Sequence, residues 1–181
     1  MANFSAALAK TLKWEGGYSN RSTDRGLETI KGVSRVNWPN WEGWKIVDKY
    51  RSSPEFPDIL LSLQKLNDLI VKFYKENFWD KIQGDNISDQ PLANKVFDIA
   101  VNCGVFIAVK ELQKAIVALR QFYIAIDGRF GPKTLNALNL CDPDDLLNKF
   151  RELLEEHYRD IVANDPEQKV NLNGWLNRLH A

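Results

Sequence analysis

The feature that most constrains the fold is the helical spacing of apolar residues along most of the 181-residue chain. In five segments the apolar side chains recur three and four positions apart, which lines one face of an α-helix. These segments are residues 4–15, 58–79, 91–103, 105–119 and 142–162. Only residues 18–34, rich in Asn, Ser, Thr, Asp and Gly, carry a convincing strand or turn signal. The pattern predicts a mainly α fold with a short loop or β-hairpin after the first helix.

Two Xaa-Pro pairs predict where later helices begin. Asp142-Pro143 is typical of an N-cap followed by proline at the first helical position. Gly131-Pro132, after Asp127-Gly128, predicts a tight turn that leads into another helix. A helix is therefore expected to begin close to each of these two prolines.

Charge and composition exclude several classes of protein. The formal charge is zero, from 24 basic and 24 acidic residues, which argues against tight unspecific binding of nucleic acid. No apolar run reaches the ~20 residues that a membrane span needs. The first residues lack the basic start and apolar stretch of a secretory signal, so we expect synthesis in the cytoplasm without a signal peptide.

The cysteines and histidines predict no metal site and no cofactor. The two cysteines, Cys103 and Cys141, favour free thiols in a reducing compartment over a disulfide. The two histidines, His157 and His180, have too few thiols near them in the sequence for a usual zinc site.

Glu15 is the first candidate catalytic residue. It lies at the predicted end of the first helix, just before Gly16-Gly17. The negative end of a helix disfavours a charged carboxylate, and apolar surface from Trp14 and Tyr18 has the same effect. A carboxylic acid that keeps its proton is what general-acid catalysis needs. The alternative is an ordinary solvated glutamate.

The loop that follows supplies further candidates. Asp24 and Thr29 place a carboxylate and a hydroxyl where they could hold a water opposite an acid, which is the two-carboxylate arrangement of glycosidic-bond cleavage. The alternative for Asp24 is a role in a turn, because Asp-x-Gly is common in turns. Glu28 is a competing carboxylate in the same loop and ranks below Asp24.

Polar and aromatic side chains in the middle of the chain suggest a sugar-binding wall. Asn94, Asp98 and Asn102 recur every four residues and share one helical stripe. This stripe fits either a cleft wall or a buried polar network, with Asp98 the more structural member and Asn102 the better ligand contact. Tyr74 and Trp79 are candidates to stack on sugar rings, although aromatic residues at helical spacing are more often part of a core.

Several ordered motifs resemble the glycoside hydrolase 108 family, the N-acetylmuramidases of phage endolysins and bacterial secretion activator proteins. The resemblance spans nearly the whole chain, in the expected order. Its motifs are Trp14-Glu15-Gly16-Gly17-Tyr18-Ser19-Asn20, Asp24-Arg25-Gly26, Thr29, Lys31-Gly32-Val33, Phe73-Tyr74, Phe78-Trp79, Phe97-Asp98-Ile99-Ala100-Val101-Asn102-Cys103-Gly104, Leu112-Gln113, Asp127-Gly128-Arg129-Phe130-Gly131-Pro132-Lys133-Thr134-Leu135 and Gly174-Trp175-Leu176-Asn177-Arg178.

The resemblance implies a lysozyme-like helical fold with Glu15 as the catalytic acid beside a cleft. It implies a catalytic region at 1–104 and a peptidoglycan-binding region at 105–181, packed into one compact unit. The expected activity is hydrolysis of the β-1,4 bond between N-acetylmuramic acid and N-acetylglucosamine in peptidoglycan. Catalytic Glu15, Asp24 and Thr29 would be joined by the substrate-binding residues Tyr18, Tyr74, Trp79, Asp98 and Asn102.

One residue departs from the family pattern. Leu27 stands where many members carry a second glycine after the aspartate. Either Leu27 adopts the positive φ that glycine prefers, or the loop is rebuilt around a packed leucine. We expect the packed leucine.

A different class of function stays open beside the enzyme, namely a non-catalytic peptidoglycan-binding protein that assists secretion. For the enzyme, peptidoglycan glycan strands are the expected partner. The route to the cell wall, by a holin, by a secretion apparatus or after lysis, is not decided by the sequence.

Overall fold

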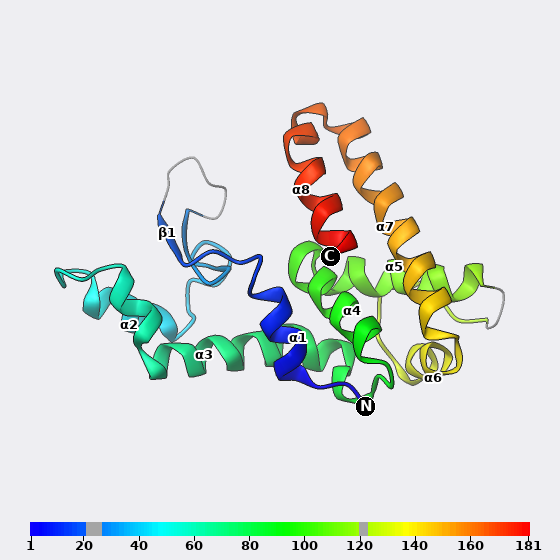
Figure 1. The fold of residues 1–181 in the computed structure, drawn as a ribbon, viewed down its shortest axis with the longest axis horizontal. Helices are drawn as coiled ribbons and strands as arrows, with labels where there is room; N and C mark the ends of the chain where they lie inside the picture. The colour runs from blue at the N-terminus through cyan, green and yellow to red at the C-terminus, as the bar shows by residue number, and fades with distance from the viewer. Residues whose placement is uncertain (21–26, 120–122) are drawn as a thin grey trace. The chain divides into compact units, whose positions relative to one another are not determined.

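The computed structural model describes residues 1–20, 27–119 and 123–181 (Figure 1). Most of these residues are helical, which confirms the predicted mainly α fold. The α-helices are α1 (Phe4–Thr11), α2 (Gly43–Tyr50), α3 (Gln64–Tyr74), α4 (Gln90–Cys103), α5 (Val105–Ala118), α6 (Pro132–Leu140), α7 (Pro143–Asn164) and α8 (Lys169–His180). The shorter helical segments are η1 (Asp58–Ser62), η3 (Asp80–Ile82), η4 (Gly84–Asn86) and η5 (Pro166–Gln168), which are 3₁₀ turns, and the π-helical η2 (Lys75–Trp79).

The chain divides into two compact units. Unit 1 is Met1–Ala7 together with Phe78–Ala181, and unit 2 is Leu8–Asn77. The expected sequence boundary between 104 and 105 lies inside unit 1, where α4 and α5 pack against each other. The assignment of residues 1–104 and 105–181 to two functional regions therefore stays a prediction from sequence motifs, independent of the compact units.

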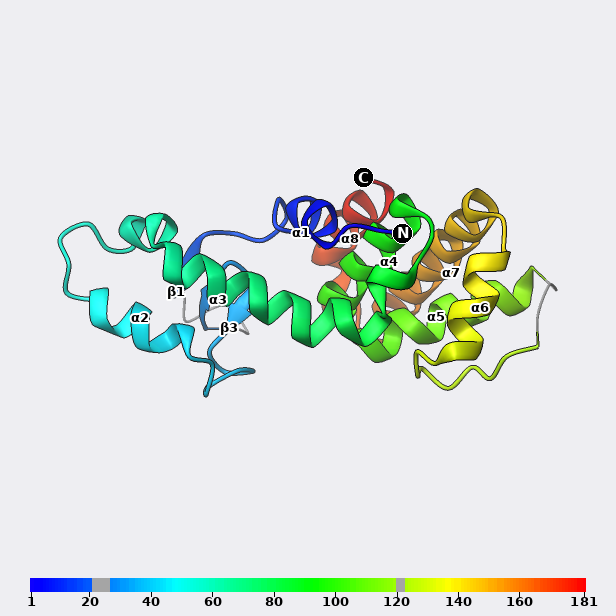
Figure 2. The same cartoon turned by 90° about the horizontal axis from the view of Figure 1, so that it is seen from below.

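Unit 2 contains the hairpin that the sequence predicts after the first helix. Its three antiparallel strands are β1 (Tyr18–Asn20), β2 (Glu28–Ile30) and β3 (Val33–Ser34), in the order β1-β2-β3. Thr29 pairs with Ser19 on one side and Ser34 on the other. Ile30 is fully buried in the core of the unit. Figure 2 shows α2 alongside α3, and the two helices are in contact.

Two helix boundaries differ from the prediction. The first helix ends at Thr11 rather than near residue 15, because Lys13 and Trp14 donate to carbonyls only three residues back and so tighten the chain into turns. The helix expected over 58–79 is interrupted at Leu63, whose ψ of 105° is extended. One extended residue hardly disturbs the spacing of apolar side chains, so the sequence carries no sign of this break.

Unit 1 is built around α4, α5 and α7, with α8 running beside α7 (Figure 1). The predicted start of α7 is confirmed, since the Asp142 carboxylate accepts the backbone N–H groups of Asp144 and Asp145 at 3.0 Å. Pro132 is the first residue of α6, as the Gly131-Pro132 pair predicts. Within the described ranges, no helix has the length and apolarity needed to cross a membrane.

Both cysteines belong to unit 1 and both are free thiols. Cys103 is half-buried and Cys141 is buried. Burial raises the pKa of each thiol, so each favours its neutral form.

Candidate active site

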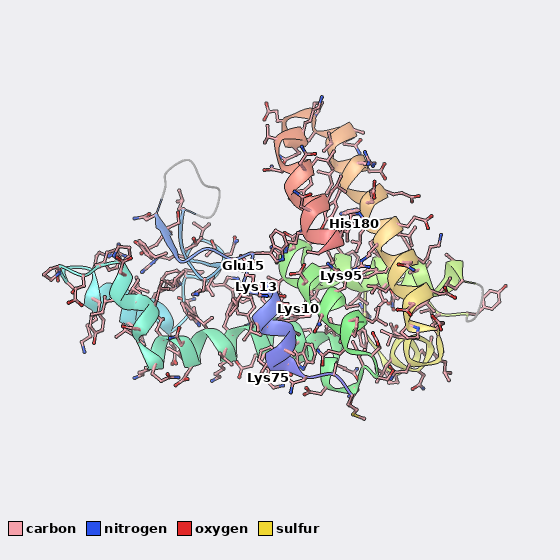
Figure 3. All side chains as sticks on the ribbon, viewed as in Figure 1. Lys10, Lys13, Glu15, Lys75, Lys95 and His180 are labelled. Atoms are coloured by element: carbon pink, nitrogen blue, oxygen red, sulfur yellow. The ribbon has the colours of Figure 1, made fainter. Side chains whose placement is uncertain are left out.

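Glu15 lies in unit 2 on the segment that leaves α1, four residues beyond Thr11. Figure 3 shows Lys10 on α1, with Lys13 and Glu15 following it on this segment. The Glu15 side chain is half-buried, so it is neither in the core nor freely solvated. The turn between β2 and β3 lies close to its carboxylate.

The β2–β3 turn contacts Glu15 through Gly32. Gly32 has φ +78°, and a Cβ atom built on it would lie 2.6 Å from Glu15 Oε2 and 2.5 Å from the Tyr74 hydroxyl oxygen. The carboxylate and the phenol therefore both rest against the α-carbon of Gly32. Only glycine gives both the backbone conformation and the space for this approach.

Tyr74 supports the same turn through a hydrogen bond. It is the last residue of α3, its side chain is buried, and its hydroxyl donates to the Lys31 carbonyl oxygen at 2.7 Å. The ring is 1% exposed, so it presents no face on which a sugar could stack. The structure therefore places Tyr74 as a support of the turn that carries Gly32 rather than as a sugar platform.

Of the other two catalytic candidates, the structure describes only Thr29, in β2. Asp24 falls outside the described residues. Thr29 is half-exposed, and the alternation of side chains along a strand puts it on the face opposite Glu28 and Ile30. It remains available to a ligand, and its role stays a prediction.

The expected packing of Leu27 is wrong. Leu27 has φ +48° and is 45% exposed. It thus adopts the backbone conformation that glycine prefers while its side chain gains little burial. Leu27 itself therefore has the backbone conformation that a glycine would take.

Glu28, the competing carboxylate, is an anchor for the sheet. It is 8% exposed, and its oxygens lie 2.7 Å from Arg35 Nε and 2.6 Å from Arg51 Nη2. Asp48 binds the same two guanidinium groups, which lowers the pKa of its carboxyl. With its oxygens committed to these partners, Glu28 ties β2 to α2 and is poorly placed to donate a proton to a substrate.

Tyr18 belongs to this ionic cluster. Its hydroxyl donates to Glu28 Oε1 at 2.9 Å, and burial followed by this hydrogen bond raises the pKa of the phenol. Its ring packs edge-on against Phe56 at 4.8 Å. Tyr18 is half-buried and holds Glu28, and its contact with substrate stays a prediction.

Trp79 lies in the core of unit 1. Trp79 is 0% exposed, and its indole N–H donates to Asp85 Oδ1 at 2.8 Å. Phe4 and Phe97 pack against the ring at 5.6 Å. The indole therefore has no exposed face on which a sugar could stack.

The polar stripe of α4 is mostly a network within unit 1. Asp98 is 6% exposed and accepts from Arg178 Nε and Nη2 of α8 at 3.0–3.2 Å. Asn102 donates to the Tyr158 hydroxyl at 3.0 Å but is itself exposed. Asp98 thus ties α4 to α8, and Asn102 is the member of the stripe that solvent can reach.

Gln113 stabilises a turn through its side-chain amide. The sequence pattern alone did not predict this role. Buried Gln113 donates to Asp127 Oδ1, the Arg129 carbonyl and the Thr134 hydroxyl at 3.0–3.1 Å. Its amide oxygen accepts the backbone N–H groups of Asp127 and Gly128. Two hydrogen bonds lower the pKa of the Asp127 carboxyl: the larger effect comes from the Arg129 backbone N–H, and the smaller from the Gln113 side chain. Gln113 therefore stabilises the turn before α6.

The arrangement around Glu15 is suited to acid–base chemistry. A half-buried carboxyl lies close to the α-carbon of Gly32, in a turn that Tyr74 supports by a hydrogen bond, and general-acid catalysis needs a carboxyl that is held in place. Within the part of the chain that the structure describes, no three His, Cys, Asp or Glu side chains are grouped closely enough to hold a metal ion. The sequence did not predict a role for Gly32 in the site. Position 32 requires a glycine partly because the Tyr74 hydroxyl lies against it, and Tyr74 is 42 residues further along the chain.

Comparisons with known proteins agree with the motifs. The family described as "Glycosyl hydrolase 108" matches residues 8–104, and the family described as "Predicted Peptidoglycan domain" matches residues 107–180. The structure of Brucella abortus SagA is similar to this chain with a TM-score of 0.69 and 26% sequence identity, covering 98% of this chain and 89% of that one. No curated protein matches the sequence.

Proposed function

The chain belongs to the glycosyl hydrolase 108 family, and on that premise we propose that it is an N-acetylmuramidase. The family and the peptidoglycan domain together support a glycosidase that acts on peptidoglycan. The proposed reaction is hydrolysis of the β-1,4 bond between N-acetylmuramic acid and N-acetylglucosamine.

Glu15 is the proposed general acid, which protonates the glycosidic oxygen as the bond breaks. Asp24, with Thr29, stabilises the oxocarbenium-like transition state or orients the attacking water. Two carboxyl groups are sufficient for this chemistry, so the mechanism requires no metal or organic cofactor.

The observation that carries the proposal is the contact of Glu15 with Gly32. A general acid must keep its proton-bearing oxygen within hydrogen-bond reach of the leaving oxygen, and a freely rotating surface glutamate would not do so. The Glu15 carboxylate lies close to the α-carbon of Gly32, and Tyr74 supports the turn that contains Gly32. A surface glutamate without a catalytic role would not need this support.

Substrate attraction is consistent with the charges near Glu15. Lys10 and Lys13 precede it in the chain and are exposed (Figure 3). Peptidoglycan carries carboxylates on its lactyl groups and stem peptides, so nearby ammonium groups favour its approach. The protein would reach the wall through a holin, a secretion apparatus or lysis of the cell.

Treatment of purified peptidoglycan, followed by borohydride reduction and analysis of the fragments, tests the proposal. A muramidase produces fragments with reduced muramic acid at their ends. Reduced glucosamine ends would assign the other glycosidic bond. Retention of the protein on peptidoglycan without new reducing ends would favour the non-catalytic binding protein.

A further inference from the structure

Unit 2 contains an open pocket of about 210 Å³ that none of the catalytic candidates lines. It lies between the segment that leads into α2 and one face of α3. Its walls combine the aromatic rings of Trp41 and Phe73 with amide and charged side chains. This volume is suited to one pyranose ring with its substituents.

Trp41 forms a fixed aromatic wall of this pocket. A Cβ atom on Gly43 would lie 2.2–2.4 Å from three carbons of the Trp41 six-membered ring, so the ring lies directly over the Gly43 α-carbon. Trp44 and Phe73 meet it edge-on, with centroids 5.3 and 6.0 Å away. The half-buried indole is thereby held in one orientation while it also lines the pocket.

Polar groups surround the aromatic wall. Asn40 and Glu42 flank Trp41 in the sequence and are exposed, and Asn77 and Lys72 line the α3 side. The Asn77 amide nitrogen donates to the Phe73 carbonyl at 2.9 Å, which orients the amide oxygen. A flat ring beside amides and charged groups matches the needs of a sugar, which has an apolar C–H face and a rim of hydroxyl groups.

The pocket is separate from the Glu15 site. Tyr74 sends its hydroxyl toward Lys31 and Gly32, whereas the preceding Phe73 packs against Trp38 and Trp41. Successive residues of an α-helix point about 100° apart, so the two sites use different faces of α3. The peptidoglycan domain match begins at residue 107 and does not include this pocket.

We propose that the Trp41 pocket is an accessory binding site for one N-acetylated amino sugar of a glycan strand. This inference rests on the proposed peptidoglycan function, because it assumes that the ligand is the same polymer. The site would hold the strand on unit 2 at a second point and add to retention on the insoluble wall.

The full-length Glu15→Gln variant and the N-acetylglucosamine trimer provide the test. The six tryptophan indole N–H signals are followed by ¹H–¹⁵N NMR during a titration, and the Trp41 signal is assigned with Trp41→Phe. We expect a saturable shift of the Trp41 signal. Asn40→Ala, at an exposed position, should weaken the affinity read from this signal about two- to tenfold, in keeping with the loss of one hydrogen bond.

Trp38→Phe is the matched control, because Trp38 also contacts Phe73 but does not line the pocket. It should leave the Trp41 shift and the affinity unchanged. A Trp41 signal that stays in place up to the solubility limit of the trimer overturns the proposal, and so does an Asn40→Ala variant with unaltered affinity. Catalysis is scored separately, by the reducing ends that the wild-type protein releases, so either conclusion can fail without the other.

Discussion

Replacing Gly32 by alanine tests whether the β2–β3 turn positions Glu15. At φ +78° an alanine costs about 1–2 kcal/mol of backbone strain. Its Cβ would also lie 2.5 Å from the Tyr74 hydroxyl and 2.6 Å from Glu15 Oε2. Relieving such contacts costs about 1–3 kcal/mol more, and we expect a total of about 2–5 kcal/mol.

The effect on activity should exceed the effect on stability. Tyr74 is buried and its hydroxyl is bonded to the Lys31 carbonyl, so the half-buried Glu15 carboxyl is the group that an added Cβ displaces. A displacement of about 1 Å in a catalytic group can lower the rate about 10²-fold. Activity is measured as release of reducing ends from peptidoglycan at a temperature where the variant is folded, and stability as the melting temperature.

Two other glycines provide the controls. Gly104 has φ +88° but no atom within 4 Å of an added Cβ, so Gly104→Ala reports backbone strain alone, about 1–3 kcal/mol. Gly16 adjoins Glu15 and also leaves room for a Cβ, so Gly16→Ala should keep full activity. If folded Gly32→Ala hydrolyses peptidoglycan as fast as Gly16→Ala, the turn does not position the acid.

Three further predictions concern stability, and thermal unfolding checks each of them. Asp98→Asn removes the charge that faces the nearly buried Arg178 guanidinium and should cost about 3–5 kcal/mol; an unchanged melting temperature together with lost activity would instead indicate a role for Asp98 in ligand binding. Leu27→Gly relieves a positive φ at a half-exposed side chain and should stabilise the protein by up to about 1 kcal/mol, whereas a loss of stability would mean that the leucine packs after all. Gln113→Leu removes the hydrogen bonds that close the turn at Asp127 and should cost about 2–4 kcal/mol; a neutral effect would show that the turn forms without these hydrogen bonds.

Local patterns predicted most of the helices and their starts. Apolar spacing identified α7 because it buries one continuous face, and α4 was identified although residues 92–100 are buried on all sides. Asp142 acts as the N-cap because its carboxylate meets backbone N–H groups only two and three residues away. The end of α1 and the break at Leu63 escaped prediction. Both depend on how the chain turns to reach the next element, which apolar spacing does not record.

The candidate site was predictable in part. Glu15 stands out from its own sequence neighbours, and the structure places it beside a constrained turn. The supporting contacts are long-range. Tyr74 reaches Lys31 across 43 residues, and Arg178 reaches Asp98 across 80. Local spacing suggested that Tyr74 and Trp79 could stack on sugar rings, whereas the structure buries both side chains in the core.

The central claim is that Glu15 donates the proton that cleaves the glycan strand. The most direct measurement compares the release of reduced muramic acid ends by wild-type protein, Glu15→Gln and Glu28→Gln, each below its melting temperature. We predict that Glu15→Gln lowers the rate by about 10²–10⁴-fold without loss of thermal stability. Glu28→Gln should retain activity and lose stability, because Arg35 and Arg51 lose the more buried of the two carboxylates that they share. Near-wild-type hydrolysis by Glu15→Gln, or loss of hydrolysis confined to a folded Glu28→Gln, would contradict the assignment.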